Sequence, residues 1–435
     1  MQQETDTRAL LELLELDAVM GRFGRECLLR TDLCSMALPA GISHDEVWAF
    51  AASIRRLFST EIPIRSPQGH ILWYFRHQGI IDQLCEIERY CRADSDLNRE
   101  LAEREGSPFV VKTQIEEAIA TSQLDGLDIP SDHARALLRM DRKPRQGEER
   151  LVLNTYNAIS TTHRLVGEKF TPALLRDLHN QVIDGVDPSS LRRSRERFGL
   201  CRSVYRDLVD RGSTRQIEEI CAYANHEIGD IDEHPAIRAL NLRGAIKQWQ
   251  PFSDWNGNMA SLVWRLYCLK QGYPVLGHLP VCRAILNWET GIIRPPDVIS
   301  RSLPEQWVDG NGREDYTANV TISLQLVHVE LRGLRERVAL RKHRDSEVTD
   351  SLEEDSTLNH RQRSILSRAL RHPEAEFTIR YHRTNHGVVY ATARADLLEL
   401  VEKGYLTCEH AKNAFVFRPD PHIKGRLRSV GGERR

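Results

Sequence analysis

Apolar residues recur at intervals of three and four positions along most of this chain of 435 residues. Between residues 7 and 105 this spacing predicts an all-helical lead-in, broken by turns that contain Pro and Gly. Further helices are predicted over 113–127, 149–165, 171–183 and 234–249, and then from Met259 onward. The pattern therefore predicts a mainly α protein.

The last part of the chain shows a different order of elements. Helices are predicted over 361–370, from Thr378 to a turn at Gly387, and over 390–403, and two short strands follow at 406–409 and 414–417. This order is typical of a winged helix-turn-helix. Residues 341–358 are polar and acidic without periodicity, which predicts a linker. The predicted division is 1–106, 107–340, 341–358 and 359–435.

Composition narrows the class of protein. Charged residues make up 28% of the chain and hydrophobic ones 40%, as in soluble globular proteins. Nine cysteines contain no Cys-x-x-Cys pair, which favours reduced thiols over disulfides or a zinc site. No apolar run is long enough to cross a membrane and the first residues lack the features of a signal peptide, so we expect a cytoplasmic protein that does not bind membranes.

The segment between the helices at 234–249 and 259–266 concentrates turn residues. It contains Pro251, Asp254, Asn256 and Gly257 directly before a helix. Backbone N–H groups at a helix start have no partner within the helix, so such a turn suits an anion such as phosphate. The alternative is an ordinary turn, for which the same residues are typical.

This stretch resembles the motif of the Fic (Fido) family, His-Pro-Phe-x-Asp-Gly-Asn-Gly-Arg-x-x-Arg, aligned from Gln250 to Ser261. Members of that family mostly transfer AMP from ATP to a hydroxyl of a target protein. Five positions agree with the motif: Pro251, Phe252, Asp254, Asn256 and Gly257. Four differ, because Gln250 replaces the histidine, Trp255 the first glycine, and Asn258 and Ser261 the two arginines.

A second segment resembles the family's regulatory helix, which is expected here at 113–127. The correspondence is carried by Thr121, Ser122, Leu124, Asp125 and Gly126. In the family a glutamate of this helix pairs with the second motif arginine and obstructs the γ-phosphate of ATP. The resemblance places Asp125 at the glutamate position and makes Ser261 its expected partner.

The resemblance extends over about residues 107–335 and implies a helical Fic core with a small β-hairpin flap. The flap is expected at 184–213, with a strand pair around Gly199, and is the expected contact for a protein target. A literal Asp-Gly-Asn-Gly-Arg string at 309–313 lacks the preceding His-Pro-Phe, and we interpret it as a turn before a helix over 316–338.

The substitutions change what the site can do. The amide of Gln250 has no basic form at neutral pH and cannot take a proton from an attacking hydroxyl. ATP and Mg²⁺ are the cofactors that the resemblance implies. The expected contacts are Asp254 for the metal, Asn256, Gly257, Asn258 and Ser261 for the nucleotide, and Arg265 as a substitute for a lost arginine.

Three hypotheses remain open for the core. The leading one is a Fic-fold protein with lost or weakened AMP transfer that senses a nucleotide or acts as a regulator. The first alternative is an active transferase with altered chemistry, and the second is a scaffold that binds nothing.

The basic C-terminal module adds DNA as an expected partner. Residues 359–435 carry 15 Lys and Arg against 8 Asp and Glu, whereas the whole chain has a net charge of −2. The expected contacts are Tyr390, Thr392 and Arg394 in the major groove, Lys412 on the wing, and Arg426 and Arg428 on the tail. Docking of a protein is the alternative use of such a module, and the sequence leaves a homo-oligomer open.

Overall fold

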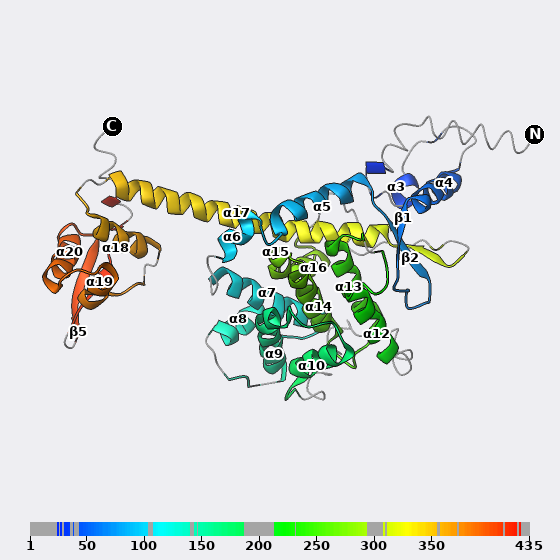
Figure 1. Cartoon of the computed structure of the whole chain (residues 1–435), viewed down its shortest axis with the longest axis horizontal. Coiled ribbons are helices and arrows are strands. Elements are labelled where there is room, and N and C mark those ends of the chain that lie inside the picture. The colour runs from blue at the N-terminus through cyan, green and yellow to red at the C-terminus, as the bar shows by residue number, and fades with distance from the viewer. Residues whose placement is uncertain are drawn as a thin grey trace, which may run out of the picture. The chain divides into compact units, whose positions relative to one another are not determined.

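The computed structural model is mainly α-helical and divides into two compact units, Met1–Arg332 and Gly333–Arg435 (Figure 1). The structure describes residues 24–25, 27, 30–34, 38, 43–102, 108–139, 143–145, 147–186, 213–230, 232–293, 308, 311–354, 357–371, 374–411, 414–423 and 426–427. The predicted mainly α fold is thereby confirmed.

The lead-in of the first unit contains a small sheet as well as helices. Helices α3 (Arg30–Cys34), α4 (His44–Leu57), α5 (Gln78–Cys91) and α6 (Asp96–Ala102) flank strands β1 (Ser59–Ile62) and β2 (Ile71–Phe75). Strand β2 pairs antiparallel with β1 and parallel with β3 (Arg313–Asp315). The prediction of an all-helical lead-in is therefore wrong, because short strands of four and five residues give no stable alternation in the sequence.

The sheet also corrects the interpretation of the string at 309–313. Its last residue, Arg313, begins β3 opposite Ile71 rather than belonging to a turn alone. The predicted flap pair around Gly199 lies outside the described residues.

Helices form the core of the first unit. They are α7 (Pro108–Leu124), α8 (Ser131–Arg139), α9 (Gly147–Thr161), the 3₁₀ turn η1 (Thr162–Leu165), α10 (Pro172–Ile183), α12 (Ser213–Ala224), α13 (Pro235–Trp249), α14 (Asn256–Lys270), α15 (Pro274–His278) and α16 (Val281–Glu289). The predicted N-cap of α10 is present, since Thr171 accepts a hydrogen bond from the N–H of Leu174.

Helices α13 and α14 pack side by side at the centre of this unit, and α7 packs on α14 (Figure 1). The side chains of α14 are buried continuously from Asn258 to Cys268, and Met259, Leu262, Val263 and Leu266 are fully enclosed. A helix that is buried on all sides belongs to the interior, so the loop before it is fixed from several directions.

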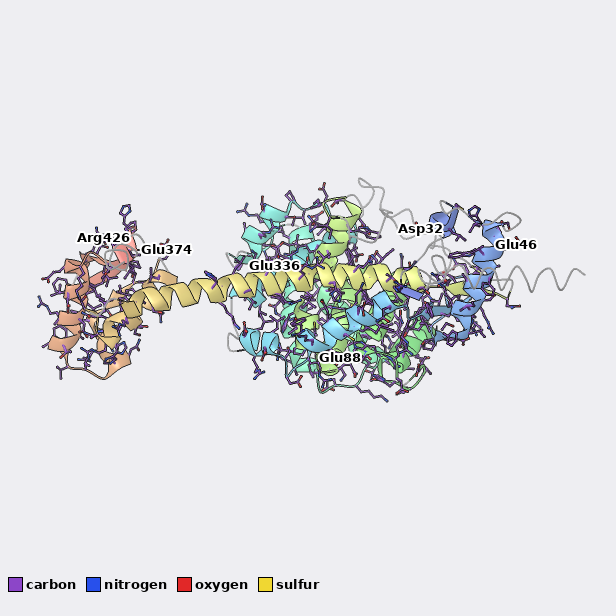
Figure 2. The ribbon with its side chains drawn as sticks, turned by 90° about the horizontal axis from the view of Figure 1, so that it is seen from above. Asp32, Glu46, Glu88, Glu336, Glu374 and Arg426 are labelled. Carbon is purple, nitrogen blue, oxygen red and sulfur yellow. The ribbon has the colours of Figure 1, made fainter. Side chains whose placement is uncertain are left out.

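Glu88 on α5 connects the lead-in to the core (Figure 2). Its carboxylate lies 2.9 Å from Nε2 of His234, the residue before α13, and accepts a hydrogen bond from the hydroxyl of Tyr273, the residue before α15. The lead-in therefore positions the starts of two core helices.

Helix α17 (Thr317–Glu354) corrects the predicted linker. The helix expected over 316–338 is present but continues to Glu354, so residues 341–354 are helical. The sequence of this segment is rich in acidic and basic residues and has no apolar stripe, which is why periodicity did not indicate a helix. Within the described residues no helix is long and apolar enough to cross a membrane.

The second unit has the predicted order of elements with one addition. It contains α18 (His360–Arg371), β4 (Phe377–Thr378), α19 (Ile379–His386), α20 (Tyr390–Glu402), β5 (Leu406–Ala411) and β6 (Ala414–Pro419). Strand β4 was not predicted and pairs with β6, giving the order β4-β6-β5. Thr378 caps α19 through the N–H of Tyr381, and Gly387 and Gly404 end α19 and α20 at positive φ.

We expect the buried pair of Arg238 and Glu233 to be essential for the first unit. Arg238 Nε donates to Glu233 at 3.2 Å, and both side chains are almost completely buried. Arg238→Ala leaves a buried carboxylate without its cation and should lower the free energy of unfolding by about 3–5 kcal/mol in chemical denaturation. Arg215→Ala, which breaks an exposed pair with Glu219, should cost less than about 1 kcal/mol, and equal losses would refute this expectation.

Candidate functional site

The loop between α13 and α14 is bracketed by two residues in the left-handed conformation. Gln250 caps the C-terminus of α13 at φ 48°, and its N–H donates to the carbonyl of Ile246. Trp255 precedes α14 at φ 61° and is buried. A residue with a Cβ pays a steric cost in the left-handed conformation, so glycine would be the easiest residue at position 255. Burial of the Trp255 indole offsets that cost.

Asn256 fixes the inner face of the loop. Its side-chain oxygen accepts from the N–H of Phe252 at 3.0 Å, and its side-chain nitrogen donates to the carbonyl of Phe252 at 2.8 Å. The amide is thus used to close the loop on itself. Asn256, predicted to contact a nucleotide, instead shapes the turn.

His179 on α10 holds the outer face. Its Nε2 lies 3.0 Å from the carbonyl oxygen of Asp254, and its ring stacks on Phe252 at 4.9 Å. Because a carbonyl only accepts, Nε2 carries the proton and donates. Burial lowers the pKa of His179 and favours the neutral ring, whereas the hydrogen bond to the Asp254 carbonyl opposes this shift.

The N-terminus of α14 is occupied by a carboxylate of the chain itself. Oδ2 of Asp125 accepts from the backbone N–H of Gly257 at 2.7 Å and of Asn258 at 3.1 Å. Oδ1 lies 3.1 Å from Nζ of Lys247, which projects from the last turn of α13. Asp125 therefore acts as an internal anion at the place where the sequence predicts a phosphate.

Helix geometry explains why Asp125 reaches this place. It follows the end of α7, and the turn after it is made by Gly126 at φ 89°. The C-terminal end of α7 meets the N-terminal end of α14, so the negative end of one helix dipole faces the positive end of the other. The negative charge of Asp125 is unfavourable at the C-terminal end of α7 and favourable at the N-terminal end of α14.

Position 257 requires a glycine in this arrangement. A Cβ on this residue would collide with the carboxylate of Asp125. The glycine allows the carboxylate to approach the backbone donors directly.

A second contact between α7 and α14 lies one turn deeper. The hydroxyl of Ser261 donates to Glu117 at 2.6 Å, and the N–H of Cys282 at the start of α16 donates to the same carboxylate at 2.9 Å. Glu117 is buried, and burial raises its pKa. The expected pairing of Asp125 with Ser261 is wrong, because Ser261 lies a full helical turn beyond the donors that Asp125 contacts.

Between these contacts lies a pair of buried polar groups. The side chain of Asn258 is fully buried, and within the described residues neither atom of its amide has a hydrogen-bond partner. The same holds for the hydroxyl of Thr121 on α7. The side-chain NH2 of Asn258 therefore keeps both of its donors, whereas its backbone N–H is bonded to Asp125.

Arg265 is placed differently from its predicted role. Its guanidinium donates to the carbonyl of Gly277 at 2.8 Å and lies 2.9 Å from Nδ1 of His278, both in α15. Burial lowers the pKa of Arg265 to about 10 and, together with Arg265, lowers that of His278 to about 3, so the histidine accepts as the neutral ring. Eight residues separate Arg265 from Gly257, about 12 Å along a helix, which is too far to replace a phosphate clamp.

The remaining predicted residues of the core are near the loop but not joined into a metal site. Gln250 and Asp254 are half-buried at the loop's ends. Ser122 donates to the carbonyl of Ala118 within its own helix. In the part of the chain that the structure describes, no group of three or more His, Cys, Asp or Glu side chains gathers as metal ligands would.

The Asp125 carboxylate occupies the place at the start of α14 that a phosphate would take. The donors that would bind a phosphate, the N–H groups of Gly257 and Asn258, already bind Asp125, and Lys247 neutralises the same carboxylate. The geometry supports a closed anion site.

Three functional contacts escaped the sequence analysis, namely Lys247, Glu117 and His179. Spacing alone could have indicated Glu117, because residues 117, 121 and 125 follow at intervals of four and share one face of α7. No sequence signal links His179 to Asp254, 75 positions later.

In the second unit, Tyr390 is 53% exposed at the start of α20, Arg394 is exposed and Thr392 is half-buried. Arg426, expected on a mobile tail, lies against Gly404 instead, where a Cβ would collide with its guanidinium. Lys412 and Arg428 lie outside the described residues.

Two solved structures similar to this chain are Fic proteins. The first is a Fic family protein from Desulfovibrio desulfuricans, with a TM-score of 0.48 and 16% identity over 80% of this chain and 98% of its own. The second is a fragment of Fic-1 from C. elegans, with a TM-score of 0.41 and 15% identity over 69% of this chain and 78% of its own. No family model and no curated protein matches the sequence.

We expect Gly257→Ala to destabilise the protein by about 1–3 kcal/mol, because the added methyl group displaces the Asp125 carboxylate from its donors. In an Asp125→Ala background the same substitution should cost less than about 1 kcal/mol, since the obstructing group is gone. A double-mutant cycle of unfolding free energies measures the difference. Additive effects would show that the two residues do not interact.

Proposed function

We propose that this protein is a Fic-type protein that has lost AMP transfer and works as a regulator, with its phosphate site closed by its own Asp125. One observation carries the proposal: the Asp125 carboxylate accepts both backbone N–H groups at the start of α14. A site whose donors are already satisfied cannot stabilise charge on a transferred group.

The residue at position 250 supports the same proposal. Transfer to a hydroxyl requires a group that takes its proton, and Gln250 has no basic nitrogen. The imidazole that touches the loop, His179, uses Nε2 to hold the Asp254 carbonyl and stacks on Phe252. It is a positioning residue and not a substitute base.

The closed site also suggests how a nucleotide would be sensed. A phosphate group would compete with Asp125 for the same two N–H donors and for Lys247. Its binding free energy would be reduced by the cost of displacing the carboxylate, so binding would release the end of α7. Release of α7 would be the regulatory signal.

Removal of Asp125 should open the site. In calorimetric titration, Asp125→Ala should bind Mg-ATP at least about tenfold more tightly than the unaltered protein does. In the unaltered protein, displacing the Asp125 carboxylate takes up part of the binding free energy. Neither protein should transfer label from ATP to any protein, because the base is still missing.

Asp132→Ala is the matched control, since this exposed acid on α8 lies outside the loop contacts and its removal should leave ATP affinity unchanged. Label transfer by the unaltered protein, lost in Asp254→Ala, would instead establish the active transferase.

We further propose that the second unit binds DNA as a winged helix-turn-helix. The order β4-β6-β5 around three helices is the arrangement such a module needs, and Val389 and Tyr390 are 69% and 53% exposed where α20 begins. Large apolar groups exposed at the N-terminus of a helix suit contact with base edges in a major groove. Arg394, one turn further along, would reach a phosphate or a base.

Arg394→Ala should lower affinity for duplex DNA several-fold and reduce the dependence of affinity on salt by about one counterion, because one cationic contact is lost. Fluorescence anisotropy at several salt concentrations measures both effects. Arg418→Ala is the control, since Glu376 and Glu409 already neutralise that side chain. Affinity for DNA that does not fall with added salt would indicate a protein-docking module.

A further inference from the structure

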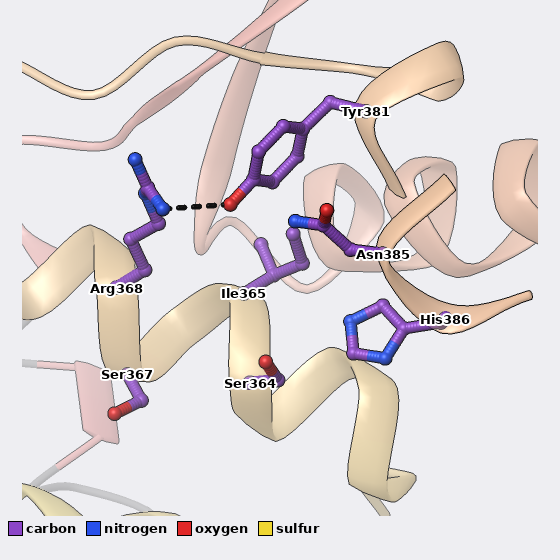
Figure 3. Close-up of a pocket in the computed structure, with 7 residues that line it drawn as sticks. All are labelled: Ser364, Ile365, Ser367, Arg368, Tyr381, Asn385 and His386. Carbon is purple, nitrogen blue, oxygen red and sulfur yellow. Dashed lines mark hydrogen bonds between the residues drawn. The ribbon is translucent and has the colours of Figure 1, made fainter. Parts of the chain in front are cut away.

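A groove of about 530 Å³ lies between α18 and α19 in the second unit (Figure 3). Its polar lining consists of Ser364, Ser367, Arg368, Tyr381, Asn385 and His386. The volume falls in the range of sites for small molecules. No carboxylate lines it, so the groove offers mainly hydrogen-bond donors and one fixed positive charge.

Tyr381 positions the side chain of Arg368 in the groove. Its Nη1 donates to the hydroxyl of Tyr381 at 2.7 Å, and its guanidinium carbon lies 5.2 Å from the centre of the Tyr381 ring (Figure 3). A guanidinium has five N–H groups, and the bond to Tyr381 uses one of them. An ordered arginine loses little freedom on binding an anion, which favours affinity.

Charged groups of both signs lie near His386, at the end of the groove. Burial, His382, His360 and Arg361 lower the pKa of His386, and Asp396 opposes this shift. The positive charge that the groove itself contains is that of Arg368. Ser364 adds a hydroxyl to the lining, whereas the side chain of Ser367 points away from the Arg368 guanidinium (Figure 3).

The lining also suits a planar ring. The ring of Tyr381 forms one side of the groove, Ile365 lies at its base and the imidazole of His386 lies at its end (Figure 3). Aromatic and aliphatic faces of this kind accept a flat, partly apolar group beside the anion.

The groove is connected to α20 by a buried chain of contacts. The ring of His386 packs against that of His382 at 4.8 Å, and Nε2 of His382 lies 3.0 Å from Asp396 on α20. Asp396 also accepts from Arg361 on α18 at 2.7 Å. A ligand that shifts His386 therefore acts on the helix that presents Tyr390 and Arg394.

We propose that this groove binds a nucleoside monophosphate, with the phosphate on Arg368 and the base against Tyr381 and His386. Occupancy is transmitted to α20 through His382 and Asp396. The effect on DNA rests on the proposed function of the second unit, whereas binding itself does not.

Calorimetric titration of the full chain with AMP, adenosine and inorganic phosphate tests the binding. AMP should bind at one site, and adenosine and phosphate each at least about tenfold more weakly, because each lacks half of the contacts. Arg368→Ala should weaken AMP binding by about tenfold or more, and Arg368→Lys nearly as much, because lysine lacks the planar fork.

Arg418→Ala, in the same unit, should leave AMP affinity unchanged, as should Asp132→Ala, an exposed acid on α8. Because Arg368 is exposed, its variants should fold like the unaltered protein. Circular dichroism checks this. Absence of AMP binding at millimolar concentration, equal binding of adenosine, or AMP affinity unaffected by Arg368→Ala would overturn the proposal.

A second measurement separates a free nucleotide from the DNA backbone as the source of phosphate. Saturating AMP should change duplex affinity at least about threefold in the unaltered protein and not in Arg368→Ala. Weaker DNA binding by Arg368→Ala without AMP would assign the groove to DNA phosphate and refute the nucleotide. Failure of every variant to bind DNA would refute the proposed DNA function, and the AMP titration would still decide the groove.

Discussion

The contact of the Asp125 carboxylate with the N-terminus of α14 is the interaction on which the arrangement of the candidate site depends. It joins three helices, because Asp125 follows α7, the N–H donors belong to α14, and Lys247 comes from α13. The interaction also fixes the identity of Gly257, which has no room for a side chain. In this structure the two N–H donors stabilise the fold by binding a carboxylate of the chain itself.

The substitutions in the loop form a consistent set around that contact. With a carboxylate in the anion site, an arginine clamp has no phosphate to hold, and Ser261 instead bonds to the buried Glu117. Trp255 takes the left-handed conformation that a glycine would adopt more easily, and its burial adds to the core. Ser261 thereby joins α14 to α7, and Trp255 buries its indole at the start of α14.

Sequence reasoning reached the elements and the neighbourhood of the site but not its contacts. Helices α10 and α13 and the second unit follow from caps and apolar spacing, which are local properties. The strands β1, β2 and β3 were missed because a short strand depends on a partner far along the chain, as Ile71 depends on Arg313. The partner of Asp125 was assigned by analogy to Ser261, and only the three-dimensional packing shows that it is the backbone of Gly257 and Asn258.

The most direct test is a crystal structure of the unaltered protein with Mg-ATP, at a concentration that saturates Asp125→Ala but not the unaltered protein, beside that of Asp125→Ala at the same concentration. The account predicts that the unaltered protein keeps the Asp125 carboxylate on Gly257 and Asn258 with no phosphate there. It predicts that the variant binds a phosphate group at those two N–H donors. A nucleotide phosphate on the N–H groups of Gly257 and Asn258 in the unaltered protein, with Asp125 turned away, would contradict it.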